Sequence, residues 1–177
     1  MKQILLHLCC ANCGTIPIEL LKDEFDLTLY WFNPNIQPEQ EHEKRLKDAE
    51  KLAQIYNLEL IKELYCPQKW LEQVKGLELE PEGGQRCKVC FQIRIEKTAQ
   101  TAMKKNFDYF ATTLTMGPQK KAAIINKIGQ ESAQNLKFYE ADFKKKDGFK
   151  KSVQWSKKYN FYRQNYCGCV FSQKKVK

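Results

Sequence analysis

The stretch Met1–Gly14 reads MKQILLHLCCANCG, and it decides the fold because an apolar run passes directly into a group of cysteines. Gln3–Leu8 is typical of a buried strand: it is continuous, apolar and of strand length. Cys9–Gly14 follows it as a loop of small residues. A chain that opens this way places three thiols at the end of its first strand.

Further along, segments with strand and helix patterns alternate. Strands are expected at Gln3–Leu8, Leu27–Phe32, Leu58–Leu64, Phe107–Leu114 and Leu136–Tyr139. Helices are expected at Thr15–Lys22, Pro38–Tyr56, Pro67–Lys75, Arg86–Lys105, Pro118 to about Gln134, and Gly148–Tyr159. The alternation predicts an α/β fold with a mostly parallel five-stranded sheet and helices on both faces. Such sheets bind ligands at the carboxyl ends of their strands, which is where Cys9–Gly14 lies.

Charge is distributed unevenly over the 177 residues, which we interpret as a single domain, 1–177. Residues 144–177 hold 11 Lys and Arg against one acid, whereas residues 1–143 have a net charge of −1. This basic helical segment is expected to pack back on the cysteine site. It predicts a polyanionic partner, most often nucleic acid, although a solvated basic tail is the alternative.

Aromatic residues are interleaved with the basic ones in this segment. Such residues suit stacking on unpaired RNA bases, or else they anchor the segment to the core. They are Trp155, Tyr159, Phe161, Tyr162, Tyr166 and Phe171.

No apolar run approaches the ~20 residues of a membrane helix, and Met1–Leu8 is too short for a signal peptide. We therefore expect a cytoplasmic protein with no membrane partner. In a reducing compartment, clustered cysteines indicate metal ligands or redox groups.

The eight cysteines form three clusters and one singleton: Cys9, Cys10 and Cys13; Cys87 and Cys90; Cys167 and Cys169; and Cys66, which we expect to be inert. The CxxC pair shares one helical face, and the helix N-terminus is expected to lower the pKa of its thiols. The neighbouring residues Cys9 and Cys10 can bind different metal centres. The CxC pair can chelate a metal or close an easily reduced disulfide.

Histidine is too scarce for a mixed zinc site, since only His7 and His42 occur. Seven clustered thiols favour thiolate-rich centres, and an iron–sulfur cluster would use four of them. The other three would serve a second metal or a redox pair. His7 is expected to be a packed residue, and the Thr112–Thr115 hydroxyls either bind substrate or satisfy a turn.

Several motifs are spread over nearly the whole chain: 5–13 (LLHLCCANC), 32–38 (FNPNIQP), 83–91 (GGQRCKVCF), 107–115 (FDYFATTLT), 142–146 (DFKKK) and 162–169 (YRQNYCGC). In this order they resemble the motifs of the QueH family, the cobalamin-independent epoxyqueuosine reductases.

The resemblance implies a tRNA-modifying oxidoreductase that converts epoxyqueuosine to queuosine at the anticodon wobble position. It implies a fold like that of the adenine nucleotide alpha-hydrolases, a 4Fe–4S cluster without cobalamin, and an external electron donor such as ferredoxin or flavodoxin. Alternatives are a zinc-stabilised RNA-binding protein without catalysis and a thiol–disulfide oxidoreductase.

For the site, the resemblance implies Cys9, Cys10, Cys87 and Cys90 as cluster ligands, with Cys167 and Cys169 as a redox-active disulfide or as ligands. A second partition places Cys10, Cys87, Cys90 and Cys169 on the cluster, and Cys9, Cys13 and Cys167 on a mononuclear iron. Cys13, Cys167 and Cys169 are the expected catalytic cysteines. Some relatives resemble this chain but carry Asp at position 13, which favours a metal role there.

Overall fold

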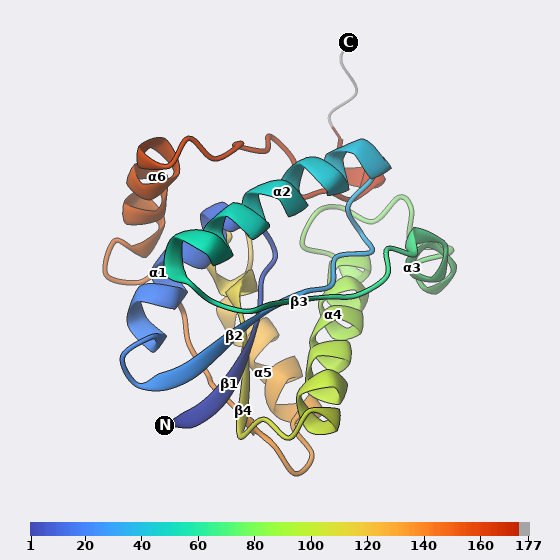
Figure 1. The fold of residues 1–177 in the computed structure, drawn as a ribbon. Helices are drawn as coiled ribbons and strands as arrows, with labels where there is room; N and C mark the ends of the chain where they lie inside the picture. Colours follow the sequence, from blue (N-terminus) through green and yellow to red (C-terminus); the bar gives the residue numbers. More distant parts are fainter. Residues whose placement is uncertain (174–177) are drawn as a thin grey trace.

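The computed structural model describes residues 1–173 and contains one five-stranded sheet in the order β3-β2-β1-β4-β5 (Figure 1). All strand pairs are parallel, as the alternating pattern predicts. The strands are β1 (Lys2–His7), β2 (Phe25–Trp31), β3 (Leu60–Lys62), β4 (Tyr109–Thr112) and β5 (Lys137–Phe138).

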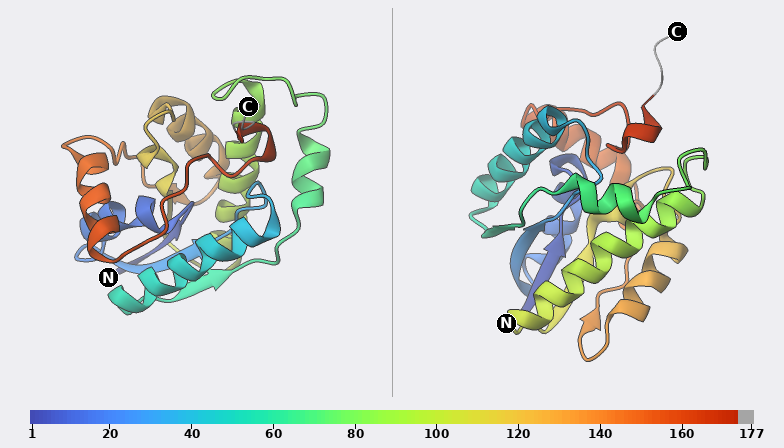
Figure 2. Two further views of the ribbon diagram at one scale, coloured as in Figure 1. Left: turned by 90° about the horizontal axis from the view of Figure 1, so that it is seen from above. Right: turned by 90° about the vertical axis from the view of Figure 1, so that its right-hand side faces the viewer.

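Helices cover both faces of this sheet (Figure 2). One face carries α1 (Ala11–Leu21), α2 (Glu39–Tyr56) and α6 (Gly148–Lys158), and the other carries α4 (Gln85–Lys104) and α5 (Ala122–Ser132). The short helix α3 (Pro67–Gln73) packs on α4. Strand side chains alternate between the two layers: Ile4 and Leu6 enter one apolar cluster, whereas Leu5 enters the other.

The strand order reverses at β1, because β2 and β3 lie on one side of it and β4 and β5 on the other. The crossover helices change face at the same point. A crevice therefore opens beyond the carboxyl ends of β1 and β4, which is the usual ligand position in open α/β sheets. The cysteine loop follows β1 into this crevice.

Some boundaries differ from those expected. Helix α1 begins at Ala11, four residues early, because the Cys10 side chain caps it by accepting the Cys13 N–H. The expected start of α5 at Pro118 is wrong: the 3₁₀ turn η1 (Thr113–Met116) follows β4, and α5 begins only at Ala122. A second 3₁₀ turn, η2 (Val170–Ser172), ends the described chain. Among residues 1–173, none of the helices has the length and apolar character that a bilayer crossing requires.

Candidate metal centre

Both neighbouring strands hold the loop that follows β1. Leu8 N donates to Tyr30 O at 2.8 Å, and the Asn33 side-chain amide donates to Leu8 O at 2.9 Å. On the other side, Cys9 N donates to the Thr113 hydroxyl at 3.0 Å. These contacts fix the loop against β2 and against the end of β4, so its thiols have little positional freedom.

Three sulfur atoms meet in this loop. The Sγ atoms of Cys9, Cys10 and Cys13 all lie within 4.8 Å of one another, and they form the one such group of potential ligands in residues 1–173. Although Cys9 and Cys10 are neighbours, the turn into α1 directs both sulfurs to the same place. Cys9 and Cys10 are 5% and 2% exposed, so the group is nearly shielded from solvent.

The three thiols share protons. Hydrogen bonds from the Cys10 and Cys13 thiols hold the pKa of Cys9 well below its ordinary value. Hydrogen bonds with Cys10 and Cys9, together with burial, raise the pKa of Cys13 well above its own. Cys9 is therefore the thiol of the three that ionises most readily, and metal binding would displace protons from its partners.

Two cationic side chains line the cavity beside these sulfurs. The buried Arg94 donates from Nη2 to the Asn33 side-chain oxygen at 2.6 Å. Burial opposes the charge on Lys120, but the electrostatic attraction of Cys167 and Cys9 outweighs it and raises the pKa of Lys120. The site therefore combines anionic sulfur with fixed positive charge.

His7 is fully buried and both of its ring nitrogens are occupied. Its Nδ1 accepts from the Thr112 hydroxyl at 2.9 Å, and its Nε2–H donates to Phe32 O at 3.2 Å. Burial lowers the pKa of His7 to about 3, so the ring is neutral. His7 is thus the packed residue that the sequence predicts.

The Thr112, Thr113 and Thr115 hydroxyls all bond within the protein. Thr112 accepts from Leu114 N at 3.2 Å, and Thr115 accepts from Phe143 N at 3.4 Å. Thr113 contacts the sulfur of Cys9 at 3.2 Å. Of the two alternatives left open for these residues, the turn is observed for Thr112, and substrate binding stays a prediction.

The CxxC pair lies in the first turns of α4. Gly83 N donates to Cys87 Sγ at 3.2 Å, and Cys90 is buried beside Trp70. Burial raises the pKa of Cys90 to about 11 and also raises that of Cys87. The expectation that the helix N-terminus lowers these pKa values is therefore wrong for the metal-free site, because desolvation outweighs the helix end.

The CxC pair reaches the same edge of the sheet through residues 162–172, which we call the strap. Cys167 lines a cavity of about 440 Å³ together with Cys9, Cys10 and Cys13. Cys169 instead packs in a small apolar cluster with Cys90, Trp70 and Val74. Both are free thiols, and so is the isolated Cys66.

The six aromatic residues singled out in the basic segment serve mainly as anchors and none of them is exposed, whereas Phe149 of α6 is 41% exposed and lines the cavity. Trp155, Tyr159 and Phe161 pack on the apolar cluster beneath α1, and Phe171 stacks on Trp70 at 6.3 Å. The sequence could not separate this use from RNA stacking. The exposed groups here are lysines, among them Lys145, Lys146, Lys150 and Lys151; Lys174, Lys175 and Lys177 lie outside the described residues.

Comparison with known proteins gives a consistent result. The family model "Epoxyqueuosine reductase QueH" matches residues 4–175. A curated protein of that name from Streptococcus pyogenes is 41% identical over 97% of this chain and 71% of its own length. Another, from Thermotoga maritima, is 37% identical over 97% of this chain and 91% of its own.

Two solved structures share the fold. The U34-tRNA thiolase NcsA from Methanococcus maripaludis, solved with its [4Fe-4S] cluster, matches 97% of this chain and 61% of its own with a TM-score of 0.61. A predicted tRNA methyltransferase subunit from Methanocaldococcus jannaschii matches 89% of this chain and 75% of its own with a TM-score of 0.59. At 14% identity each, they show the fold alone.

Proposed function

The chain belongs to the epoxyqueuosine reductase QueH family, and we propose that it reduces epoxyqueuosine to queuosine at the wobble position of tRNA. The observation that carries this proposal is the family match across residues 4–175, which includes every cysteine of the cavity. The zinc-stabilised RNA-binding protein and the thiol–disulfide oxidoreductase are less favoured, since neither explains a match to a reductase family over the whole fold.

The donor set fits an iron–sulfur cluster. Seven thiols lie along one edge of the sheet, mostly shielded from water, and thiolates are the ligands that such clusters require. Arg94 and Lys120 supply positive charge that offsets the charge of several thiolates. A zinc site would need four of these ligands and would leave three unexplained.

The surroundings of the seven clustered cysteines favour one division of these ligands between two metal centres. Cys169 packs beside Cys90, which supports these two as ligands of one 4Fe–4S cluster, and we propose Cys10 and Cys87 as its other two ligands. Cys167 lines the cavity with Cys9, Cys10 and Cys13, and we propose Cys9, Cys13 and Cys167 as the ligands of a second iron. The alternative, in which Cys167 and Cys169 form a redox disulfide, is less favoured because the two thiols occupy different environments.

The reaction removes the epoxide oxygen as water and leaves an alkene, so it consumes two electrons and two protons. When bound, the metal centres supply single electrons and Lewis acidity toward the epoxide oxygen. The chain itself supplies a partly enclosed cavity and a protonated amine, Lys120 Nζ, at its wall. Electrons enter from an external donor, which we propose is a ferredoxin or flavodoxin.

The tRNA partner would contact the lysines of α6 and of the preceding loop. Lys145, Lys146, Lys150 and Lys151 are exposed there, whereas Lys144 Nζ is bound to Lys120 O at 2.7 Å. Helix α6 also lines the cavity through Ser152 and Ser156. Phosphate contacts on α6 would therefore hold the anticodon loop beside the thiolates.

The test uses anaerobically reconstituted protein, a chemical reductant and tRNA that contains epoxyqueuosine. Nucleoside mass analysis should show conversion to a product lighter by one oxygen atom. An unchanged nucleoside, with iron and sulfide present in the protein, would refute the proposal. A colourless protein whose main metal is zinc would favour the RNA-binding alternative.

A further inference from the structure

The strap carries two of the seven thiols but has little regular structure of its own. It leaves α6, crosses the carboxyl edge of the sheet above α2, and ends in η2 beside α3 and α4 (Figure 1). Something other than its own backbone bonds must therefore hold Cys167 at the cavity and Cys169 beside Cys90.

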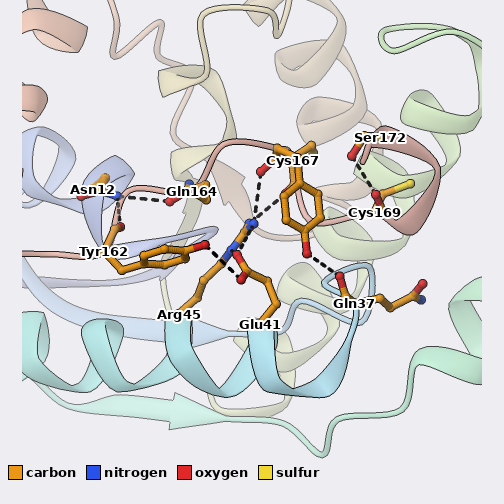
Figure 3. Close-up of polar contacts among 10 residues, drawn as sticks. Asn12, Gln37, Glu41, Arg45, Tyr162, Gln164, Cys167, Cys169 and Ser172 are labelled. Atoms are coloured by element: carbon orange, nitrogen blue, oxygen red, sulfur yellow. Dashed lines mark hydrogen bonds and ion pairs between the residues drawn. The ribbon is translucent and has the colours of Figure 1, made fainter. Parts of the chain in front are cut away.

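Arg45 of α2 meets the strap from below (Figure 3). Its Nη1 donates to Cys167 O at 3.0 Å, and its Nη2 donates to Tyr166 O at 3.1 Å. Arg45 is only 3% exposed, so these charge-assisted bonds form away from water. Because they end on backbone carbonyls, they fix the path of the chain on both sides of the Cys167 amide.

Glu41 orients the guanidinium of Arg45. The Glu41 Oε1 accepts from Arg45 Nε at 2.8 Å and lies 2.8 Å from Nη2, and its Oε2 accepts from the Tyr162 hydroxyl at 3.2 Å. Four of the five N–H groups of an arginine are thereby engaged. Arg45 therefore has little capacity left for a substrate phosphate, although it lines the cavity.

Gly168 allows this close approach. It has φ of +119° and its carbonyl accepts from Gln37 N at 2.8 Å. A Cβ at this position would lie 2.9 Å from Ile36 Cγ1 and 3.1 Å from Arg45 Nη1. Any side chain between the two cysteines would push the strap away from Arg45.

We propose that Arg45, oriented by Glu41, is a positioning residue that latches the strap so that Cys167 and Cys169 reach the metal site. This inference rests on the proposed function for its catalytic meaning, but the latch itself is a property of the chain. Cys9, Cys10 and Cys13 are held by the sheet, so they stay in place when the latch opens. The last two thiols are delivered only by the docked strap.

The test compares Arg45→Met, Arg45→Lys and the control Lys47→Met, which removes an exposed charge from the same helix. Reconstituted and iron-free proteins are treated anaerobically with iodoacetamide, and peptide masses give the alkylation rate of each cysteine. We expect Arg45→Met to raise the rates of Cys167 and Cys169 by about ten- to a hundredfold in the iron-free protein. Cys66, whose side chain contacts Gln68 and neither Arg45 nor the strap, serves as the internal standard and should not change.

Arg45→Lys keeps the positive charge but loses the paired N–H donors of the guanidinium group. It should therefore recover part of the protection of Cys167 and Cys169 against alkylation. In the reconstituted protein, Arg45→Met should bind less iron per chain and lower kcat, with the KM for tRNA unchanged. Wild-type rates at Cys167 in Arg45→Met would overturn the proposal. So would equal rates in Arg45→Met and Lys47→Met.

Gly168→Ala tests the latch without altering Arg45 and should expose the same two thiols. If Arg45→Met unfolds, the buried Cys10 will react with iodoacetamide as well. The Gly168→Ala variant then decides the question. If its Cys167 and Cys169 react at the wild-type rates, the proposal is overturned. The iron-free comparison does not require activity. A wild type that lacks reductase activity would therefore refute the proposed function. The latch would still be judged by the alkylation rates of the iron-free proteins.

Discussion

At the scale of single residues, Lys120 is the cationic group that faces the thiolates from the loop before α5. Its side chain folds over Gly117, and its raised pKa keeps it charged at neutral pH. A charge at this position can stabilise the oxygen that leaves the epoxide and donate a proton to it.

We therefore expect Lys120→Met to lower kcat by about a hundredfold while the KM for tRNA stays within about twofold. Single-turnover assays on reconstituted protein measure this. The neighbouring Lys121→Met removes an exposed lysine from the same loop and is the control. Equal losses in the two variants would contradict the role of Lys120, as would a loss confined to KM.

His42 makes the stability of the protein depend on pH. The buried ring accepts from Trp31 Nε1 at 2.9 Å and stacks on Tyr65, with ring centroids 4.1 Å apart. Burial, aided by the Arg45 guanidinium, lowers the pKa of His42 from 6.5 to about 4. The unfolded chain therefore takes up this proton first as the pH falls, and stability present above pH 6.5 is lost toward pH 4.

Urea unfolding of iron-free protein at pH 7 and pH 5 measures this loss. We expect His42 to account for about 1 to 2 kcal/mol of the decrease. His42→Gln can still accept from Trp31 but does not titrate, so it should show a correspondingly smaller difference between the two pH values. An equal difference in both proteins would show that other groups cause it.

Single residues also show how far the sequence could be interpreted. The scarcity of histidine and the spacing of the cysteines were enough to predict a thiolate-rich site. The pKa values of Cys87 and Cys90 were predicted in the wrong direction, because depth of burial depends on α3 and the strap. Arg45 carried no signal at all, since an i,i+4 pair with Glu41 on a polar helix is normally a surface pair.

At the scale of elements, α6 combines two faces with different tasks. Ser152 and Ser156 are buried toward the cavity, whereas Lys150, Lys151, Lys157 and Lys158 are exposed. The helix therefore lies between a cationic surface and the thiolates. Its sequence predicted the charge, but the burial of its serines follows from packing on α1.

Replacing Lys150 and Lys151 with Ala should weaken tRNA binding about three- to thirtyfold at moderate salt. It should also flatten the slope of log K against log salt, because fewer counterions are released. Filter binding at several salt concentrations measures both. Lys104→Ala with Lys105→Ala removes two exposed charges from the far end of α4 and is the control. A slope that does not change would contradict a phosphate role for α6.

The elements themselves were predicted from the alternating pattern, including the number and direction of the strands. Ends of elements were harder to predict. Thr113–Met116 has β-branched residues typical of a strand, yet it turns because the Thr112 hydroxyl accepts from Leu114 N. Pro118 follows this turn, so its preference for a first helical position is not used.

At the scale of the whole molecule, the thiol site adjoins one end of the apolar core, since Cys9 and Cys10 belong to one of its clusters. Two apolar clusters fill the space between the sheet and its helices, and most of their members are aliphatic or aromatic residues of strands and helices. The cysteines lie at the rim, at the carboxyl edge of the sheet. Folding therefore derives mainly from burial of apolar surface, as in other domains of this size.

We accordingly expect iron-free protein to keep its native far-UV circular dichroism and to unfold cooperatively. Bound iron should raise Tm, since it binds the folded chain in preference to the unfolded one. Replacing Cys87 and Cys90 with Ser should abolish this increase in Tm but leave the circular dichroism of the iron-free protein unchanged. Loss of secondary structure on iron removal would contradict a preformed fold, because it would mean that the metal, as in small zinc domains, supplies the free energy of folding.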